Sequence, residues 1–505
     1  MPRGAQPKCG PFREDEMFKH VLLGTLALIL VPISASAQGV CPLNGSLSNK
    51  LVCVIPQTFG PFGFGSGPGA PLIANQHQAH FEGDFLSSFG PINEAVGIQV
   101  SQLPIASPSS GITFTFDPAL KTFSPSTEET LGPILGERAN TIGRNKLYVA
   151  FSFQYFNFNS IDGQNTSNIP AVLKHQPFPP LGPTFPGFLQ SCPNQTGMTG
   201  SFAGNPCFVR DFIQTTNNID LRVHQYTIYA TYGITRHLDF SVAVPILDVS
   251  MKVNTGATIV QNSFGPGNTA FHQFNPAIVA GCTATPCFNG TFPSSRTATG
   301  IGDVVLRGKY EVYEGEHLGF GVGVDVRLPS GDEQNFLGSG AVGVRPFGVV
   351  SYGARISPHA EIGYEKNGQS TLAGDFVGPT ATNSKAGLPD RFVYIVGADA
   401  SIVKRLTASF DIYGQRLFGV PQLFSTTFTD LGKCSDVNCT TLTPGTTHPD
   451  VGVLSRTDYN ITNASIGLKY RLFSHLVVTG NALIKLDDAG LRTTVIPLVG
   501  VSYSF

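Results

Sequence analysis

The chain has 505 residues, 32 basic and 34 acidic side chains, and a charged fraction of only 13%. That fraction is about half of the roughly 25% found in soluble globular domains. The near-neutral balance argues against nucleic-acid partners, which require a basic face, and a hydrophobic fraction of 41% argues against wholesale disorder. Length alone predicts about three domains of roughly 150 residues, unless the chain closes into one large barrel.

The N-terminus has the pattern of a secretory signal peptide. A basic start at Lys19 precedes an apolar run from Val21 to Ile33, and small residues follow up to Ala37. The run is too short for a permanent transmembrane helix of about 20 residues. We therefore predict a signal peptide over residues 1–37, with a buried core helix as the competing interpretation. Acidic residues upstream of Met17 suit such a leader poorly, so Met17 is an alternative start.

From about Lys146 onward, apolar and polar residues alternate with a period of two. Phe320, Val322 and Val324 share one parity, and Gly323 and Asp325 share the other. A strand places these two sets on opposite faces. Because the polar set consists of small residues and paired charges, it suits a wet lumen, and the apolar set suits lipid.

The links between the predicted strands alternate between short and long. Short links lie near residues 233–237, 313–317, 354–357, 402–405 and 471–474. Long links lie near residues 159–218, 254–299, 329–341, 366–390, 417–458 and 487–494. This alternation of short and long links is typical of a transmembrane antiparallel up-and-down β-barrel with short periplasmic turns and long extracellular loops. We therefore predict an all-β fold of this class.

The strand count and the domain limits follow from the same pattern. About twelve segments lie after residue 145, and a further pair at 95–103 and 111–117 gives about fourteen strands, within a range of 12 to 16. We expect residues 38–94 to form an N-terminal extension or plug-like segment and residues 95–505 to form the barrel. Residues 118–144 fit either a hairpin or a partial plug.

The last strand alternates up to Tyr503 and Phe505. An alternating final strand that ends in Phe looks like the signal by which bacterial outer-membrane barrels are recognised for insertion. We therefore predict the bacterial outer membrane as the location, its lipid as a partner, and the barrel-assembly machinery as a transient partner.

The cysteines that follow the predicted leader fall into local pairs. The pairs are Cys41 and Cys53, Cys192 and Cys207, Cys282 and Cys287, and Cys434 and Cys439. An even number of cysteines in an exported chain favours disulfides. Metal binding is the competing interpretation, but histidines do not accompany the pairs, so we predict no metal.

The charged residues of the polar parity form the candidate lumenal set. These residues are Asp303, Arg307, Asp325, Arg327, Arg345, Glu361, Arg391, Asp399, Arg405 and Asp411. They predict either a mutually paired ladder that stiffens the barrel or, in part, a constriction that orients a polar head group. Gly-x-Ser-x-Gly, His-Glu-x-x-His and phosphate-binding loops are all missing from the sequence, so we expect neither catalytic residues nor a cofactor.

Two motifs carry a family resemblance. The stretch from Gly300 to Tyr310 and the stretch from Val324 to Glu333, followed by Gly343-Val344-Arg345-Pro346-Phe347, resemble the MetA-pathway phenol-degradation family of outer-membrane proteins. The resemblance implies an outer-membrane barrel associated with aromatic compounds, and it transfers no catalytic or binding residues to this chain.

These features together give three functional expectations. The leading one is a passive outer-membrane channel for small hydrophobic or aromatic compounds. The alternative is a structural or adhesive surface protein whose disulfide-bonded loops bind partners while the barrel acts as an anchor. A third, an outer-membrane hydrolase, would need a Ser/His pair within about 3 Å.

Overall fold

The computed structural model describes residues 41, 47–60, 72–74, 81, 92–100, 103–104, 114–117, 122–125, 130–174, 210–263, 272–283, 285–374, 384–435, 441–473 and 475–505. The predicted signal peptide and the expected pair Cys192 and Cys207 lie outside these residues.

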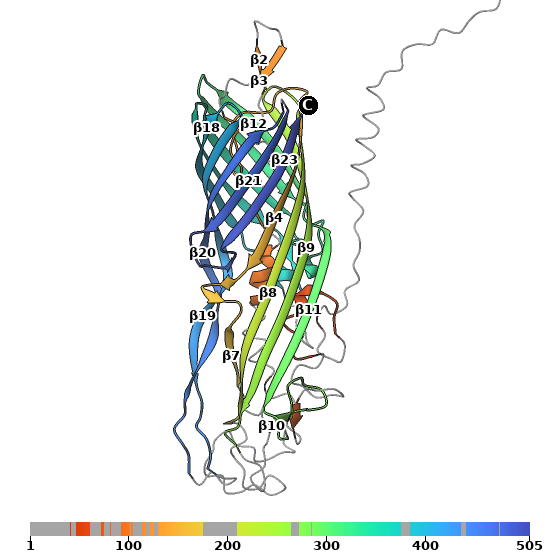
Figure 1. Cartoon of the computed structure of the whole chain (residues 1–505), viewed down its shortest axis with the longest axis vertical. Helices are drawn as coiled ribbons and strands as arrows, with labels where there is room; N and C mark the ends of the chain where they lie inside the picture. The colour runs from red at the N-terminus through yellow and green to blue at the C-terminus, as the bar shows by residue number, and fades with distance from the viewer. Residues whose placement is uncertain are drawn as a thin grey trace, which may run out of the picture. The chain divides into compact units, whose positions relative to one another are not determined.

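Twelve antiparallel strands close into a barrel (Figure 1), which we call the ring. In ring order the strands are β4 (Leu147–Phe158), β8 (Phe212–Gly233), β9 (Leu238–Val260), β12 (Val305–Glu314), β13 (Leu318–Arg327), β14 (Gly343–Tyr352), β15 (Ile356–Asn367), β18 (Arg391–Val403), β19 (Leu406–Thr429), β20 (Thr447–Arg471), β21 (Leu476–Lys485) and β23 (Val495–Ser504). The pairing of β23 with β4, from Leu498 opposite Gln154 to Ser504 opposite Tyr148, completes the closure. The predicted all-β antiparallel barrel is confirmed.

Two further strands pair with strands of the ring, and the other elements are short. β7 (Ile169–Lys174) pairs with β8, and β11 (Asn289–Ile301) pairs with β9. Four small sheets lie outside the ring. Three have two strands each: β1 (Leu72–Ala74) with β10 (His272–Phe274), β2 (Phe114–Asp117) with β3 (Thr122–Pro125), and β16 (Gln369–Ser370) with β17 (Ala386–Gly387). In the fourth, β5 (Ser160–Ile161) pairs with both β6 (Gln164–Asn165) and β22 (Leu491–Arg492). Single 3-10 turns are η1 (Leu51–Cys53), η4 (Glu333–Asn335) and η5 (Thr371–Ala373). Among the described residues, no helix has the length and apolar character needed to cross a bilayer.

The ring has twelve strands because the extra N-terminal pair does not join it. Residues 92–100, which overlap the first predicted strand at 95–103, are helical and almost wholly buried, and we call them the N-terminal helix. Their short apolar run fits a buried helix as well as a strand, since periodicity alone does not separate the two. Residues 114–117 form β2, which pairs with β3 in a separate hairpin. The ring therefore begins at Leu147, downstream of the expected boundary at residue 95.

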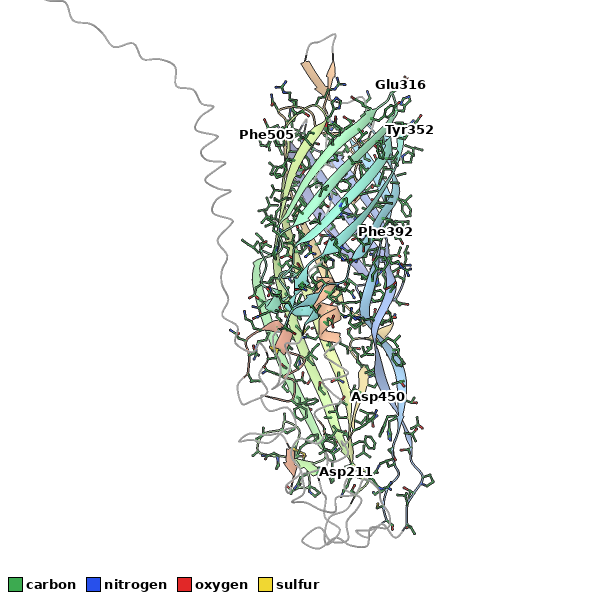
Figure 2. The ribbon with its side chains drawn as sticks, turned by 180° about the vertical axis from the view of Figure 1, so that it is seen from behind. Asp211, Glu316, Tyr352, Phe392, Asp450 and Phe505 are labelled. Atoms are coloured by element: carbon green, nitrogen blue, oxygen red, sulfur yellow. A yellow bond between two sulfur atoms is a disulfide. The ribbon has the colours of Figure 1, made fainter. Side chains whose placement is uncertain are left out.

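The alternation of short and long links is present. Short turns join β8 to β9, β12 to β13, β14 to β15, β18 to β19 and β20 to β21 at one end, which we call the turn end. Two of the predicted long loops are wrong in part, because strand structure fills much of them. β9 continues to Val260 and β11 starts at Asn289, while β19 continues to Thr429 and β20 starts at Thr447. Figure 2 shows Glu316, Tyr352 and Phe505 at the turn end, and Asp211 and Asp450 toward the opposite, loop end.

The turn-end half of the ring has an apolar outer surface. Along β13, Phe320, Val322 and Val324 are exposed, while Gly323 and Asp325 are buried on the lumenal side. β12, β13, β14, β21 and β23 each have 10 residues, the length with which a tilted strand crosses a bilayer. The predicted outward orientation of the apolar set holds on β13, and the charged residues of this half face inward together with some buried apolar residues such as Val393 and Ile395.

In the loop-end half, the chemistry of the two faces is reversed. On β8 the outward residues change from Tyr226 and Ile228 to Asp220 and Arg222, and the inward residues change from Gln225, Thr227 and Thr231 to Ile219, Leu221 and Val223. On β9 the inward residues change from Asp239 and Ser241 to Val249, Met251 and Val253, while the outward ones change from Phe240 and Val242 to Asp248 and Lys252. This half therefore has a hydrophobic core inside and a polar surface outside, as a soluble protein has.

Candidate functional site

The lumenal face of β12 to β15 carries a ladder of ion pairs. Arg307 and Arg345 lie opposite Asp325 in the strand register. Arg307 Nε donates to Asp325 Oδ1 at 2.6 Å, and Arg345 Nη2 donates to Asp325 Oδ2 at 2.6 Å. Glu361 on the next strand lies 3.2 Å from Arg345 Nη1. Cross-strand neighbours on one face of a sheet are close enough for such pairing. The register of the strands therefore places side chains of opposite charge next to one another on the lumenal wall.

A second group of paired charges lies closer to the loop end. Arg327 Nη1 donates to Asp303 Oδ2 at 3.0 Å and Arg327 Nη2 donates to Glu365 Oε1 at 2.9 Å. Arg391 Nη2 donates to the other carboxylate oxygen of Glu365 at 2.6 Å. Asp303 also accepts from the backbone N–H of Ser339 at 2.8 Å. The two arginines therefore share one carboxylate, which fixes both side chains.

A third group centres on His359. Its Nε2 lies 2.6 Å from Asp411 Oδ1, and its Nδ1 lies 3.5 Å from Asp399 Oδ1. Arg138 Nη2 donates to Asp399 Oδ2 at 2.8 Å. All four side chains are nearly inaccessible to solvent. An added Cβ at Gly136 would lie 2.6 Å from the His359 ring, so only glycine allows the backbone to approach this histidine so closely.

Residues 130–142, which we call the lumenal segment, lie against the inside of the ring. Glu137 accepts from both Arg307 and Lys309. Lys309 Nζ also donates to the carbonyl oxygens of Arg138 at 3.0 Å and Asn140 at 2.8 Å. Lys469, on β20, donates to the carbonyl oxygens of Leu131 and Pro133. Of the expected 118–144 region, the end near residue 122 thus forms a hairpin, and residues 130–142 contact the lumenal wall.

The structure brings most of the predicted lumenal residues together. Asp303, Arg307, Asp325, Arg327, Arg345, Glu361, Arg391, Asp399 and Asp411 all line the inside of the ring. The exception is Arg405, which is exposed in the turn between β18 and β19, because the strand alternation ends before it.

Sequence reasoning missed several members of the site. Glu365 and Lys309 have the same parity as predicted members of their strands, so register could have identified them. Glu137 and Arg138 lie in a stretch without periodicity, and no signal in the sequence places them.

A cavity of about 130 Å³ lies between the paired charges and the segments inside the ring. Its polar wall includes Asp325, Arg307, Arg345 and Glu361. Its apolar wall consists of Val100, Leu135, Leu247, Leu337, Val393 and Ile395, among others. The cavity is therefore amphipathic, with fixed charges on one side and aliphatic side chains on the other.

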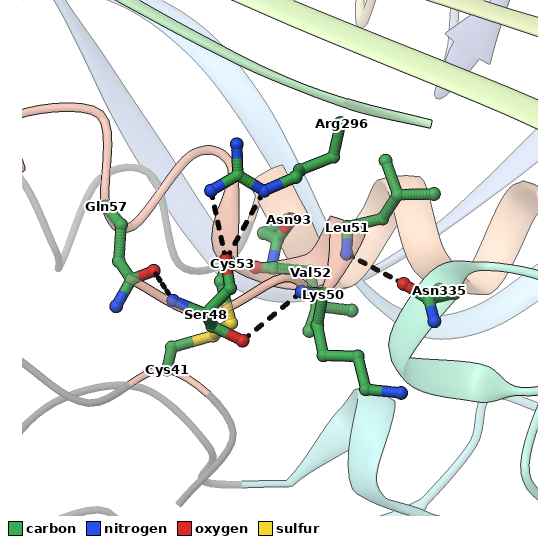
Figure 3. The surroundings of a disulfide bond; sticks show 10 residues. All are labelled: Cys41, Ser48, Lys50, Leu51, Val52, Cys53, Gln57, Asn93, Arg296 and Asn335. Carbon is green, nitrogen blue, oxygen red and sulfur yellow. Dashed lines mark hydrogen bonds between the residues drawn. A yellow bond between two sulfur atoms is a disulfide. The ribbon is translucent and has the colours of Figure 1, made fainter. Parts of the chain in front are cut away.

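Two of the predicted disulfides are formed, Cys41–Cys53 and Cys282–Cys287. Figure 3 shows the first beside η1, where Leu51 N donates to Asn335 Oδ1 at 3.1 Å and Asn93 Nδ2 donates to Val52 O at 2.6 Å. Cys434 is also disulfide-bonded, whereas Cys439 lies outside the described residues.

The predicted terminal signal lies on the seam of the ring. Tyr503 is exposed near the end of β23, and its ring lies 4.6 Å from that of Phe505. The backbone N–H of Phe505 donates to Leu147 O at 2.8 Å, so the last residue also closes the barrel.

One cluster could offer metal ligands. His237, Glu311 and Glu314 bring ligand atoms within 4.8 Å of one another at the turn end. Both acids already have partners, because Arg236 donates to Glu314 at 2.8 Å and Asn140 donates to Glu311 at 3.2 Å. Internal pairing therefore accounts for this cluster.

Residues 202–388 match a family model described as "Putative MetA-pathway of phenol degradation". The resemblance to this family is confirmed. The match spans β12 to β15, which carry the first group of paired charges, and it covers the second group except for Arg391 on β18. The closed ring and its apolar turn-end surface support the predicted outer-membrane location. The short turns predict that the turn end faces the periplasm.

Solved structures of outer-membrane barrels are similar to the chain at low identity. One is the COG4313 outer-membrane channel from Pseudomonas putida F1, with 9% identity and a TM-score of 0.38, covering 73% of this chain and 98% of that one. Another is the toluene transporter TbuX of Ralstonia pickettii, with 12% identity and a TM-score of 0.31, covering 83% and 99%. No curated protein sequence matches the chain.

Proposed function

We propose that this protein is a passive outer-membrane channel for small aromatic compounds and that the lumenal cavity is its solute site. The observation that carries the proposal is the amphipathic cavity of about 130 Å³ inside the ring. An apolar cavity of about 150 Å³ holds a benzene molecule, so this space fits a single aromatic ring. The family's association with phenol degradation supports the same class of solute.

The two walls would act on different parts of such a solute. Aliphatic side chains such as Val393 and Ile395 contact the ring, since they gain from burying apolar surface. Arg307 and Arg345 are held in place by Asp325, so they can hydrogen-bond a hydroxyl or carboxyl group without reorganising. Because the lumenal segment lies against the inside of the ring, we expect passage of a solute to require movement of this segment. The proposal assigns no catalytic step to any residue.

The test uses a pair of neighbouring positions on β18. Ile395 faces the cavity and is 4% exposed, whereas Val396 faces outward and is 54% exposed. We expect Ile395→Trp to lower phenol flux into proteoliposomes at least about tenfold by filling the cavity, and Val396→Trp to leave it unchanged. The natural chain has no tryptophan, so the fluorescence of the introduced indole also reports solute binding. Phenol flux equal to that of protein-free vesicles would overturn the proposal.

The surface-protein alternative is favoured by one observation. The lumenal segment and the N-terminal helix fill much of the inside of the ring, and disulfides hold segments near the loop end. A barrel that serves only as an anchor would need no cavity and would leave permeability unchanged on deletion. Comparison of phenol uptake by cells with and without the protein separates the two functions.

A hydrolase is a weaker candidate. The ring nitrogens of His359 face Asp411 and Asp399, rather than a serine hydroxyl, in the described contacts. A nucleophile would need a base within hydrogen-bonding distance.

We also propose that Tyr503 and Phe505 present the terminal strand to the barrel-assembly machinery. Both side chains are exposed on the outer surface of β23 at the seam. Phe505→Ala is expected to lower the amount of inserted barrel several-fold in cells, and Val499→Ala, on the same outer face, to change it little. Equal insertion of both variants would contradict this role.

A further inference from the structure

We infer that the periplasmic rim carries a binding surface for the headgroup of an anionic phospholipid. The surface consists of Arg355, Lys404, Arg405 and Arg471, and we call it the rim patch. Arg355 lies in the turn between β14 and β15, and Lys404 and Arg405 lie in the turn between β18 and β19. Arg471 is the last residue of β20, next to the turn that leads to β21.

Backbone hydrogen bonds hold these turns side by side. The N–H of Arg471 donates to the carbonyl oxygen of Arg405 at 2.8 Å. The N–H of Ser401 donates to the carbonyl oxygen of Arg355 at 2.9 Å, which ties the first turn to the strand that leads into the second. The cations are therefore fixed on neighbouring parts of a rigid rim, although they are far apart in the sequence.

The rim patch is not neutralised by acids of the chain. Residues 351–357, 400–407 and 470–476 contain no Asp or Glu. None of the four cations forms an ion pair within the described part of the chain. The Nε of Arg471 is shielded from solvent and has no hydrogen-bond acceptor among the described residues. A buried donor without an acceptor costs free energy.

The neighbouring turns of the rim do contain acidic or paired side chains. In the next turn, between β12 and β13, Glu316 is exposed, and His317 accepts a hydrogen bond from the N–H of Gly353 through its carbonyl oxygen at 2.6 Å. Farther on, Arg236 is paired with Glu314 at 2.8 Å. These two turns therefore contain acidic or paired residues, in contrast to the rim patch.

Apolar residues adjoin each cation and select a lipid over a soluble anion. Ile356 is 64% exposed, Val403 is 59% exposed and Phe473 is 66% exposed, and all three lie within two residues of a member of the rim patch. Exposed apolar residues at the end of a membrane-spanning strand contact the hydrocarbon of the bilayer. Long basic side chains beside them reach the level of the lipid headgroups. A ligand that satisfies both groups has an anionic phosphate and acyl chains, as phosphatidylglycerol in the periplasmic leaflet has.

The experiment measures retention of lipid by the full-length folded barrel. Delipidated protein in detergent receives equal amounts of dioleoyl phosphatidylglycerol and dioleoyl phosphatidylcholine, and native mass spectrometry counts the bound molecules. We expect the natural chain to prefer phosphatidylglycerol at least about tenfold. The variant R355Q/K404Q/R405Q/R471Q is expected to reduce this preference to about twofold or less.

A matched control changes the same net charge at the other end of the molecule. R222Q/K252Q/R416Q/R456Q removes four exposed cations near the loop end and is expected to keep the preference. R355K/R405K/R471K keeps the charge and should keep the preference as well. Heat-dependent gel mobility of each variant verifies that the barrel is folded, and a triple-lysine variant that remains folded without the preference would weaken the role of charge.

Two outcomes would overturn the inference. One is an unchanged preference in the folded four-glutamine rim variant. The other is binding of inorganic pyrophosphate to the rim patch in detergent as tightly as phosphatidylglycerol, since that would assign the site to a soluble anion. Phenol flux is expected to be the same in all these variants, so failure of this inference is distinguishable from failure of the channel proposal.

Discussion

The turn-end and loop-end halves of strand β8 share one alternation of inward and outward side chains but have opposite chemistry. Ile228 faces outward and Thr227 inward near the turn end, whereas Arg222 faces outward and Leu221 inward toward the loop end. The backbone does not change between the two halves, but the solvent around the strand does. The position of the reversal therefore marks where the strand leaves hydrocarbon and enters water, and β9 reverses at the same level.

The comparison also explains what fills the inside of the molecule. At membrane level the inward residues include the paired charges, and the lumenal segment contacts these charges through ion pairs and hydrogen bonds. At the loop end the inward residues are apolar, and they pack against buried residues of η1 and the N-terminal helix, such as Ile55 and Ile98. Each filling segment thus matches the chemistry of the wall that it meets.

The largest effect is expected for Arg138→Ala, which tests how the lumenal segment is held in the turn-end half. Removing one partner of a buried ion pair costs about 3 to 5 kcal/mol, and Arg138 and Asp399 are both nearly inaccessible. The lumenal segment should then leave its site between a hundred and a few thousand times more often, since 1.4 kcal/mol corresponds to a factor of ten. Single-channel recordings should show a higher open probability. Arg222→Ala, which breaks the exposed pair with Asp220, is the control, and equal recordings for both variants would show that the pair does not hold the segment.

The next effect tests where hydrocarbon ends on the outer surface. Val322→Arg places a charge in the middle of β13, on the outward face, and should destabilise the barrel by about 2 to 4 kcal/mol. Asn218→Arg adds the same side chain to the outward face of β8 in the loop-end half, where water surrounds the strand, and should cost less than about 0.5 kcal/mol. Urea unfolding in lipid bilayers measures both. Equal costs would mean that the reversal of polarity does not mark the membrane boundary.

The sequence allowed prediction of the half that lies in lipid far better than of the other half. On β13 the small and charged residues contrast with valines and a phenylalanine, so strand, orientation and lumenal set all followed from parity. The loop-end stretch from Ile219 to Val223 alternates equally well, but its apolar residues face inward. A rule that places apolar residues outward gives this stretch the wrong orientation, because the sequence alone does not state which solvent surrounds a strand.

Among the lumenal contacts, those between ring strands could be predicted from the sequence, and those made by the lumenal segment could not. Pairs such as Arg307 with Asp325 follow from register between adjacent strands, which the alternation fixes. Glu137 and Arg138 could not be assigned to the site, because residues 130–142 have no regular backbone and their positions depend on the wall that they contact.

A smaller effect concerns the N-terminal helix and pH. Burial raises the pKa of Glu94 to about 7, and the nearby charge of Arg456 opposes this only in part. The undocked carboxyl ionises near its ordinary pKa of about 4.3, so docking is strongest below that pH and weakens as pH rises to about 7. The loss is at most about 3 kcal/mol and about 2 after allowance for partial exposure. The protection factors of residues 92–100 against hydrogen exchange, which correct for the faster intrinsic exchange at higher pH, should fall between pH 5 and 7 in the natural chain and not in Glu94→Gln.

The smallest effect is expected from removing the disulfides near the loop end. This removal tests whether the two halves of the molecule are stabilised independently. The rings of Cys41–Cys53 and Cys282–Cys287 span 12 and 5 residues, so loop-closure entropy predicts about 3 and 2 kcal/mol of local stabilisation. C41A/C53A should therefore raise protease cleavage of its segment more than C282A/C287A does, by a factor of about three to four. Both variants should keep the heat-dependent gel mobility of the natural barrel, because the membrane-level ring contains neither disulfide. A loss of that mobility in either variant would show that the loop-end core supports the ring, and the two halves would then form one cooperative unit.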